Sequence, residues 1–237
     1  MAKLKDIKGT NIQFLDSDPV PGIAGWASGG NMNTARYALA GTGTQTAALG
    51  TGGRTPSYTG VTESYDGSSW TEVNDLNTGR GYLAMSGTNT AALAFGGVTP
   101  PSSAKTENWN GSAWTEVNDL NTARNALGIG ACGTNTSALA VSGQASPGIL
   151  TVNESWNGSS WTEVGDINSG RVGAAVSGAD NTSALLFGGS NPPSSSLDVV
   201  ESWNGSAWTE TTDLNTARRY CAGAGTNPSA LCIGGYA

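Results

Sequence analysis

Short runs of small and apolar residues alternate with polar, glycine-rich turns along the whole chain. Between Arg80 and Arg124 the order is GYLAMSG, a turn at TNT, AALAFGG, a loop at VTPPSSAK, and then TENWNGSAWTEV. Short apolar runs bounded by Gly, Pro, Asn and Ser are typical of β-strands rather than helices. This segment therefore predicts four strands, two before the loop and two after it.

The same order of strands recurs along the sequence. One arginine precedes each repeat, at spacings of 44, 44, 47 and 47 residues, and a tryptophan lies ten residues before each arginine. The arginines are Arg36, Arg80, Arg124, Arg171 and Arg218, and the tryptophans are Trp26, Trp70, Trp114, Trp161 and Trp208. A period of this length indicates a β-propeller or a solenoid. Four strands per repeat favour an all-β propeller, with the tryptophans buried between its blades.

The last two strands of each full repeat are separated by an Asn-Gly or Asp-Gly pair. These pairs lie at residues 66–67, 110–111, 157–158 and 204–205. Asn-Gly and Asp-Gly favour the two-residue type I′ turn, in which both central residues have positive φ. The sequence therefore predicts four tight hairpins of this type.

The number of blades follows from the ends of the chain. Four complete repeats are followed by only two strands, CAGAG and SALCIGG, within residues 218–237, whereas Trp26 indicates a fourth strand at about residues 24–31. Pairing these ends in one blade would remove exposed sheet edges. We therefore expect one five-bladed propeller over residues 21–237, with residues 1–20 closing or anchoring it.

The repeat resembles the Kelch family over about residues 26–237. Its marks are a double glycine after the second strand, an aromatic residue in the third, a tryptophan in the fourth and an arginine before the next blade. They occur as Gly52-Gly53, Tyr65, Trp70 and Arg80, as Gly96-Gly97, Trp109, Trp114 and Arg124, and as Gly188-Gly189, Trp203, Trp208 and Arg218. The third repeat departs from this pattern, because Ser142-Gly143 replaces the double glycine. The resemblance implies a β-propeller of four-stranded blades.

Composition and charge restrict the partners. The net charge of −7 disfavours nucleic acid, since binding phosphates needs a basic face. No run approaches the ~20 apolar residues that span a bilayer, and MAKLKDIKGT lacks the apolar core of a signal peptide. Three cysteines are too few for a disulfide framework. Cys221 and Cys232 either face each other on adjacent strands or, as we favour, are reduced core residues.

The five repeat arginines are the first candidate ligand contacts. They precede the innermost strand of each blade, where they would line the central channel and bind an anion. Alternatively, each pairs with backbone carbonyls or with a carboxylate, such as the glutamate 17 residues earlier (Glu63, Glu107, Glu154 and Glu201). Their recurrence in every repeat favours the structural alternative, since a functional site usually breaks the symmetry of its repeat.

The loops between the second and third strands do break the repeat. They read RTPSYTGV (54–61), VTPPSSAK (98–105), QASPGILTV (144–152) and SNPPSSSLDVV (190–200). In an up-and-down blade these loops share a face with the arginine positions. Variation concentrated on loops is typical of a binding surface, although it also fits neutral drift. Arg54 and Tyr58 are the best individual contacts on this face.

Nothing in the sequence predicts catalysis, a metal or a cofactor. The chain has no histidine, which removes the usual general base of serine and cysteine hydrolases. Carboxylate pairs such as Glu116/Asp119 recur in step with the repeat, which favours turns and caps over one acid–base site. We therefore expect a protein that is not an enzyme.

The polar Gly/Ser/Thr/Asn surface and the lysine-rich MAKLKDIKGTNIQ are similar to bacteriophage tail-fibre and other virion appendage proteins. The similarity implies a virion protein that recognises host surface glycans and contacts other virion proteins. A Kelch-type protein–protein scaffold and a purely structural decoration are the alternatives. If the protein is not phage-encoded, we expect it in the cytoplasm.

Overall fold

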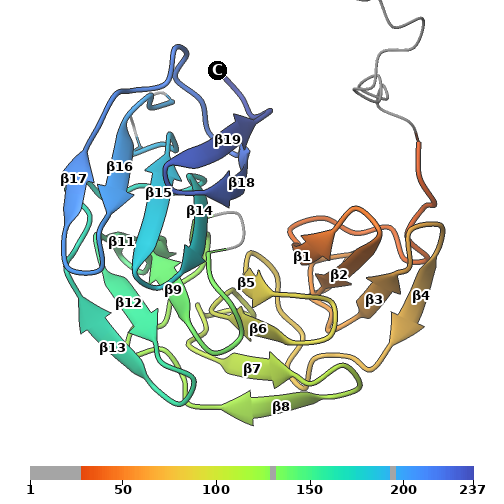
Figure 1. The fold of residues 1–237 in the computed structure, drawn as a ribbon. Helices are drawn as coiled ribbons and strands as arrows, with labels where there is room; N and C mark the ends of the chain where they lie inside the picture. Colours follow the sequence, from red (N-terminus) through yellow and green to blue (C-terminus); the bar gives the residue numbers. More distant parts are fainter. Residues whose placement is uncertain (1–27, 129–131, 193–195) are drawn as a thin grey trace, which may run out of the picture.

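The repeats form separate antiparallel sheets that lie side by side around a common centre (Figure 1). The structure is a computed structural model, and it describes residues 28–128, 132–192 and 196–237. Every regular element in this part of the chain is a β-strand, so the all-β, propeller-like fold is confirmed. Trp26, most of the strand expected at 24–31 and the segment 1–20 lie outside the described residues.

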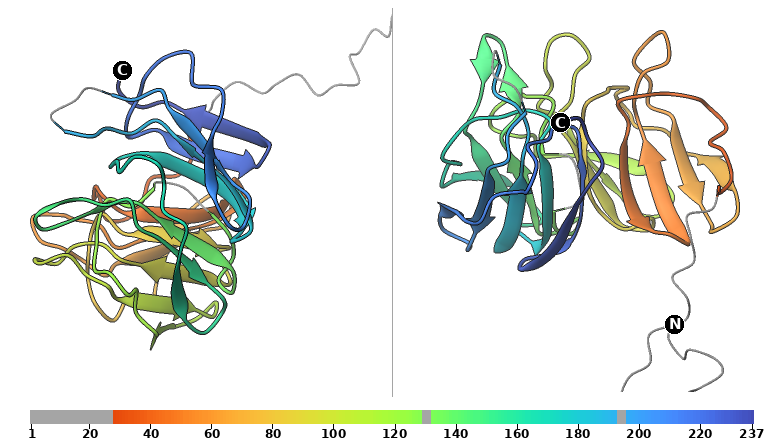
Figure 2. Two further views of the ribbon diagram at one scale, coloured as in Figure 1. Left: turned by 90° about the vertical axis from the view of Figure 1, so that its left-hand side faces the viewer. Right: turned by 90° about the horizontal axis from the view of Figure 1, so that it is seen from above.

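Three blades have four strands in the order of the chain. The first consists of β1 (Ala40–Thr44), β2 (Ala47–Thr51), β3 (Thr62–Tyr65) and β4 (Trp70–Val73). The second consists of β5 (Ala84–Gly87), β6 (Ala92–Phe95), β7 (Thr106–Trp109) and β8 (Trp114–Val117). The fourth consists of β14 (Ala175–Asp180), β15 (Ser183–Phe187), β16 (Val200–Trp203) and β17 (Trp208–Glu210). Seen from above, their strands run between two faces of the arc (Figure 2).

The third blade and the last sheet have fewer described strands. The third contains β9 (Ala138–Val141), β12 (Asn153–Trp156) and β13 (Trp161–Val164), with a small hairpin of β10 (Gln144–Ala145) and β11 (Gly148–Ile149) in its loop. The last sheet consists of β18 (Ala222–Thr226) and β19 (Ser229–Ile233), as expected for residues 218–237. The described residues thus provide four blades and a two-stranded sheet, and they do not establish the expected closed ring of five.

Apolar side chains pack between neighbouring sheets rather than in one central core. Between the first and second blades, Leu49 and Leu83 pack with Met85, Trp109 and Trp114. Equivalent clusters join the second blade to the third and the third to the fourth. Alanines on the inner strands of the second, third and fourth blades are almost fully buried. Small side chains there allow the sheets to approach closely, while the outer tryptophans fill the wider spaces between them.

Hydrogen bonds also link each blade to the one before it. The indole nitrogen of Trp114 donates to the Thr62 hydroxyl at 3.2 Å, and that of Trp161 donates to the Thr106 hydroxyl at 3.1 Å. Each bond joins the fourth strand of one blade to the third strand of the preceding blade. Trp114 and Trp161 therefore have their polar atom satisfied as well as their rings packed, whereas the indole nitrogen of buried Trp208 has no partner among the described residues.

A second set of links runs around the inner ends of the sheets. The residue two positions after each repeat arginine has positive φ, namely Ala38, Tyr82, Ala126, Gly173 and Tyr220. The Tyr82 amide donates to the Ala38 carbonyl at 2.8 Å, and the Ala126 amide donates to the Tyr82 carbonyl at 3.0 Å. The Tyr220 amide donates to the Gly173 carbonyl at 2.6 Å. These bonds link the first blade to the second, the second to the third, and the fourth to the last sheet.

The double glycine meets a specific steric need. Gly96 has a φ of 63°, and a Cβ there would lie 2.7 Å from the Arg124 carbonyl oxygen. In the third repeat Ser142 takes this position with a φ of 57°, and its hydroxyl donates to the Arg171 carbonyl at 2.5 Å. A hydrogen bond from the side chain thus accompanies the strained backbone where glycine is replaced.

The predicted type I′ turns are wrong. Asn110 is followed by Gly111 with a φ of 94°, and Asn110 itself does not have positive φ. The Asn110 Oδ1 accepts bonds from the amides of Ser112 and Ala113, each at 2.9 Å. The hairpin therefore closes through four residues between paired Trp109 and Trp114, because the Asn side chain caps the backbone of the turn.

We expect Trp114→Ala to lower the free energy of unfolding by about 3–5 kcal/mol, because it removes a buried aromatic ring and leaves a cavity between two blades. Thr115→Ala, at the next and exposed position of β8, is the control and should change it by less than about 0.5 kcal/mol. Chemical denaturation measures both. Similar values for the two variants would show that Trp114 does not join the blades.

Candidate functional site

The loops between the second and third strands pair with the residues that follow the repeat arginines. In the first blade Arg54 forms β-bridges with both Tyr37 and Tyr58, and in the second Val98 bridges Gly81 and Ser102. These segments therefore share a face, as the sequence predicted. We call it the loop face: residues 54–61, 98–105, 144–152, 190–192 and 196–200, the two residues after each repeat arginine, and Tyr236.

Arg54 and Tyr58 lie together on the loop face. The Arg54 guanidinium carbon is 5.2 Å from the centre of the Tyr58 ring, a cation–π contact. The Tyr58 ring packs over the second blade, where a Cβ at Gly81 would lie 3.2 Å from it. Among the described residues Arg54 has no ion-pair partner, so its charge is available on the surface.

Further tyrosines lie on the loop face. Tyr37, Tyr82, Tyr220 and Tyr236 are large, exposed aromatic residues, and Tyr220 meets Tyr236 edge to face with ring centres 6.4 Å apart. Five of the six tyrosines of the chain thus lie on the loop face. The sequence analysis named only Tyr58. Comparing the two residues after each repeat arginine would have found Tyr37, Tyr82 and Tyr220, and comparing the residue after each double glycine would have found Tyr236.

A polar recess lies elsewhere on the same face. It has a volume of about 730 Å³, and its lining includes Ser102, Asn125, Gln144, Thr151 and Asn191. The Asn125 side-chain amide donates to the Ser102 hydroxyl at 2.7 Å, which joins the second-blade loop to the third blade. The loop face therefore offers hydroxyl and amide groups at one place and aromatic rings at another.

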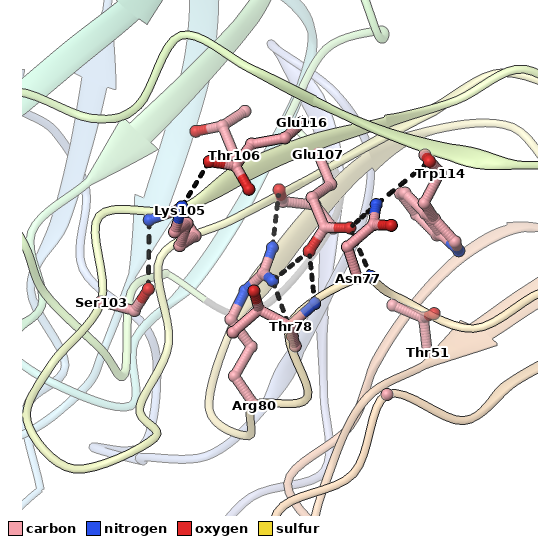
Figure 3. A network of polar contacts seen from close by, with 12 residues as sticks. Thr51, Asn77, Thr78, Arg80, Ser103, Lys105, Thr106, Glu107, Trp114 and Glu116 are labelled. Atoms are coloured by element: carbon pink, nitrogen blue, oxygen red, sulfur yellow. Dashed lines mark hydrogen bonds and ion pairs between the residues drawn. The ribbon is translucent and has the colours of Figure 1, made fainter.

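The repeat arginines are buried inside the blades. The Arg80 Nη1 atom lies 2.5 Å from Glu107 Oε1, while its Nε donates to the Gly96 carbonyl at 2.9 Å (Figure 3). The second carboxylate oxygen of Glu107 accepts bonds from the amide and the side chain of Asn77, at 2.7 and 2.8 Å. Both side chains of the ion pair are inaccessible to solvent.

This arrangement corrects the candidate list. The same buried pair occurs as Arg36–Glu63, Arg124–Glu154 and Arg171–Glu201. The partner is the glutamate 27 or 30 residues after the arginine, in the third strand of the same blade, and not the one 17 residues before it. The guanidinium groups of Arg36, Arg80, Arg124 and Arg171 are therefore engaged in ion pairs inside the blades and are inaccessible to solvent.

Arg218 differs from the other four. Its Nη1 donates to the Gly234 carbonyl at 3.0 Å, a bond equivalent to that between Arg80 and Gly96. No residue within the described ranges forms an ion pair with it, and its side chain is partly exposed. Arg218 thus has the backbone contact of a repeat arginine without the carboxylate.

Most carboxylates have structural partners. Burial raises the pKa of the Glu63 carboxyl, but bonds donated by Arg36, Asn33 and Thr34 outweigh burial and hold the pKa below its usual value. The recurring aspartates accept backbone amides at the start of the third strand, from Thr62 to Asp75 and from Thr106 to Asp119, both at 3.1 Å. These positions act as caps rather than as acid–base groups.

The structure also places the cysteines and limits metal binding. Cys132, Cys221 and Cys232 are free thiols, and burial raises the pKa of Cys132 to about 12. Within the described ranges no group of three His, Cys, Asp or Glu side chains is placed to hold a metal ion. Nor do these ranges contain a helix long and apolar enough to cross a membrane.

Comparison with known proteins adds no family to this description. The sequence matches no protein-family model and no curated protein.

We expect Arg80→Met to lower the free energy of unfolding by about 3–5 kcal/mol, because it leaves the buried Glu107 carboxylate without its partner. Glu116→Gln is the control. It breaks the exposed Lys105–Glu116 ion pair and should cost no more than about 1 kcal/mol. Denaturant melts distinguish the two. A small loss for Arg80→Met would contradict a structural role for the repeat arginines.

Acid should destabilise the fold through the turn at Asp66. Amides of Ser69 and Ser68 donate to the Asp66 carboxylate and lower its pKa to about 2. A lowered folded-state pKa stabilises the fold above the unfolded pKa of about 4, and this contribution is lost as pH falls toward 2. Asp66→Asn should therefore lose less stability than the wild type over this window, since Asn occupies the same turn in the other repeats. Melts at several pH values test this, and parallel curves would refute it.

Proposed function

We propose that the protein is a non-catalytic binding module that recognises glycans on a host surface through the loop face. The observation that carries the proposal is the contrast between the two faces of the blades. The hairpin turns at residues 66–69, 110–113, 157–160 and 204–207 are almost identical in sequence. The first loop-face position after the double glycine differs in every repeat, as Arg54, Val98, Gln144, Ser190 and Tyr236. Identical repeats would present the same side chains in every blade, whereas a single binding site requires side chains that differ between blades.

The chemistry of the loop face suits a sugar ligand. Each exposed tyrosine offers an apolar ring face together with a hydroxyl group. The recess beside Asn125 and Gln144 adds amide and hydroxyl groups for hydrogen bonds to sugar hydroxyls. The unpaired guanidinium of Arg54 favours a glycan with carboxylate or sulfate groups, because its planar fork binds such anions.

The absence of catalysis belongs to the same proposal. The full sequence has no histidine. The buried glutamates and the recurring aspartates are already engaged by arginines and backbone amides. We infer that binding needs no metal or cofactor.

We further propose that the blades are Kelch-type repeats and that the chain closes as a five-bladed ring over residues 21–237. The buried arginine, the double glycine and the paired aromatics at Trp109 and Trp114 support the Kelch assignment. The resemblance to bacteriophage tail-fibre and virion appendage proteins supports a place in a virion, with other virion proteins as neighbours. Outside a phage, the cytoplasm is the proposed location.

A protein–protein scaffold is the second candidate. Exposed Tyr and Arg side chains are enriched in the binding hot spots of protein interfaces, and the loop face has both. In that case a folded protein or peptide, rather than a sugar, occupies the loop face. A structural decoration would leave the loop face without any ligand.

A screen of the purified full chain against host polysaccharides and a glycan array tests the proposal. We expect saturable binding that Tyr58→Ala and Arg54→Ala each weaken at least tenfold, because both remove side chains of the loop face. Ser112→Ala, in a turn on the other face, is the control and should bind as the wild type does. Melts of all variants check that they fold. No binding at millimolar sugar, or equal binding by all variants, would contradict a glycan site at this place.

A further inference from the structure

The first blade exposes a surface that is buried at the other blade junctions. In the second blade Trp109 and Trp114 are 1% and 6% exposed, because they pack against the first blade. The equivalent residues of the first blade, Tyr65 and Trp70, are only partly buried, as are Met32, Leu39 and Ala48. This side of the first blade therefore carries the apolar and aromatic residues of a blade junction, but no described blade packs against it.

The last sheet exposes the complementary surface. Leu231 of β19 is 66% exposed, whereas the equivalent residues Leu49 and Leu93 are 1% and 0% exposed. Ile233 is also exposed, whereas its equivalent Phe95 is buried. In the other blades the second strand pairs with a third strand, but β19 pairs only with β18 among the described strands. Among the described residues, the edge of β19 has no partner strand, and the apolar face formed by Leu231 and Ile233 is not covered.

A cavity at the centre of the arc is lined by residues of all four blades and of the last repeat. Its volume is about 780 Å³, and its lining includes Leu39 and Trp70 from the first blade and Tyr220, Ala222 and Gly223 from the last repeat. Figure 1 shows the two ends of the arc, with β1 on one side, the sheet of β18 and β19 on the other, and no labelled strand between them.

The described start of the chain already follows the path of a repeat. The Asn33 amide donates to Glu63 and its side chain to the Trp70 carbonyl, as Asn77 does to Glu107 and Trp114. At each of these junctions the preceding residues form the fourth strand of the previous blade. The same order of elements leads us to expect that the residues immediately before 28 form the fourth strand of the last blade.

Residues 17–26 match the third and fourth strands once a single extra residue is allowed in their turn. Ser17-Asp18 then corresponds to Thr106-Glu107, Val20 to Trp109, Pro21-Gly22 to Asn110-Gly111, and Trp26 to Trp114. Pro-Gly is a favourable pair for the centre of a β-turn. In this alignment Asp18 takes the position of the glutamate that each buried arginine needs.

We propose that residues 17–26 add to the free edge of β19 as the third and fourth strands of the last blade, where Asp18 pairs with Arg218. The inference deepens the five-bladed closure proposed above and does not depend on the glycan ligand. It commits to the chain's own segment as the occupant, because Gly29 and Gly30 lie against Tyr65 and Ser68, on the side of the first blade that lacks a partner.

The strand register provides a direct test with a native cysteine. Glu107 pairs with Ala94 in the second blade, and Ala94 corresponds to Cys232 of β19. Asp18 should therefore lie directly opposite Cys232, at a Cα separation of about 4.5–5.5 Å that permits a disulfide. We would introduce Asp18→Cys into the full chain with Cys221→Ala, which removes the competing thiol. Ser17→Cys in the same background is the matched control, because its side chain points to the other face.

After mild oxidation, peptide mass spectrometry and non-reducing gels identify the bonds. We expect an intramolecular bond between position 18 and Cys232, with at least tenfold less at position 17. Equal yields, no bond, or bonds only between two chains would each overturn the proposal. These outcomes leave the glycan screen unaffected, so the two proposals fail separately.

A double-mutant cycle tests the ion pair itself. We expect Asp18→Asn and Arg218→Gln each to lower the unfolding midpoint of the full chain, and the double variant to lower it no further than the larger single change. Additive effects would show that the two side chains do not interact. Glu63→Gln with Arg36→Gln serves as a positive control, because their contact is described.

Discussion

The buried ion pair between a repeat arginine and a glutamate is the interaction on which each blade depends. The arginine comes from the segment that connects two blades, the glutamate from the third strand, and the carbonyl it also binds from the second. Two charges removed from water are costly unless every polar atom is satisfied. Here the asparagine of the connecting segment occupies the second carboxylate oxygen, as Asn77 does in the second blade. One network therefore fixes the path of the chain from one blade to the next.

This network lies inside the blades, and the side chains of the variable loops are not part of it. The arginine, the glutamate, the capping aspartates and the paired aromatics keep the sheets in place through contacts inside and between blades. The loops that follow the double glycine need only bridge back to the chain, as Arg54 does to Tyr37 and Tyr58. Their side chains can differ from blade to blade without loss of packing. Arg54, Tyr58 and the other tyrosines of the loop face occupy positions whose residues differ from blade to blade. The proposed binding site therefore centres on them.

Much of the fold could be predicted from the sequence, because the repeat specifies local strands and turns. The strands around Arg80, the buried Trp114 and the shared face of the loops were all expected. The partner of each arginine could not be predicted by counting along the chain, since antiparallel pairing brings Glu107 to Arg80 across two strands. The turn type was missed because the side chain of Asn110 caps the backbone, an effect that the Asn-Gly pair alone does not reveal. The recurrence of the repeat arginines favoured a structural role over ligand contact. The structure buries Arg36, Arg80, Arg124 and Arg171 in ion pairs, and that burial could not be predicted from the sequence because tertiary packing determines it.

The most direct test of this account is NMR of the full chain with selective ¹⁵N labelling of arginine. The chain has seven arginines, and solvent exchange of each guanidinium N–H reports whether that side chain is buried and bonded. The account predicts slow exchange for Arg36, Arg80, Arg124 and Arg171, and fast exchange for Arg54 on the loop face. Fast exchange at Arg36, Arg80, Arg124 and Arg171 would show that these guanidinium groups are not buried in ion pairs, and would contradict their role in holding the blades together.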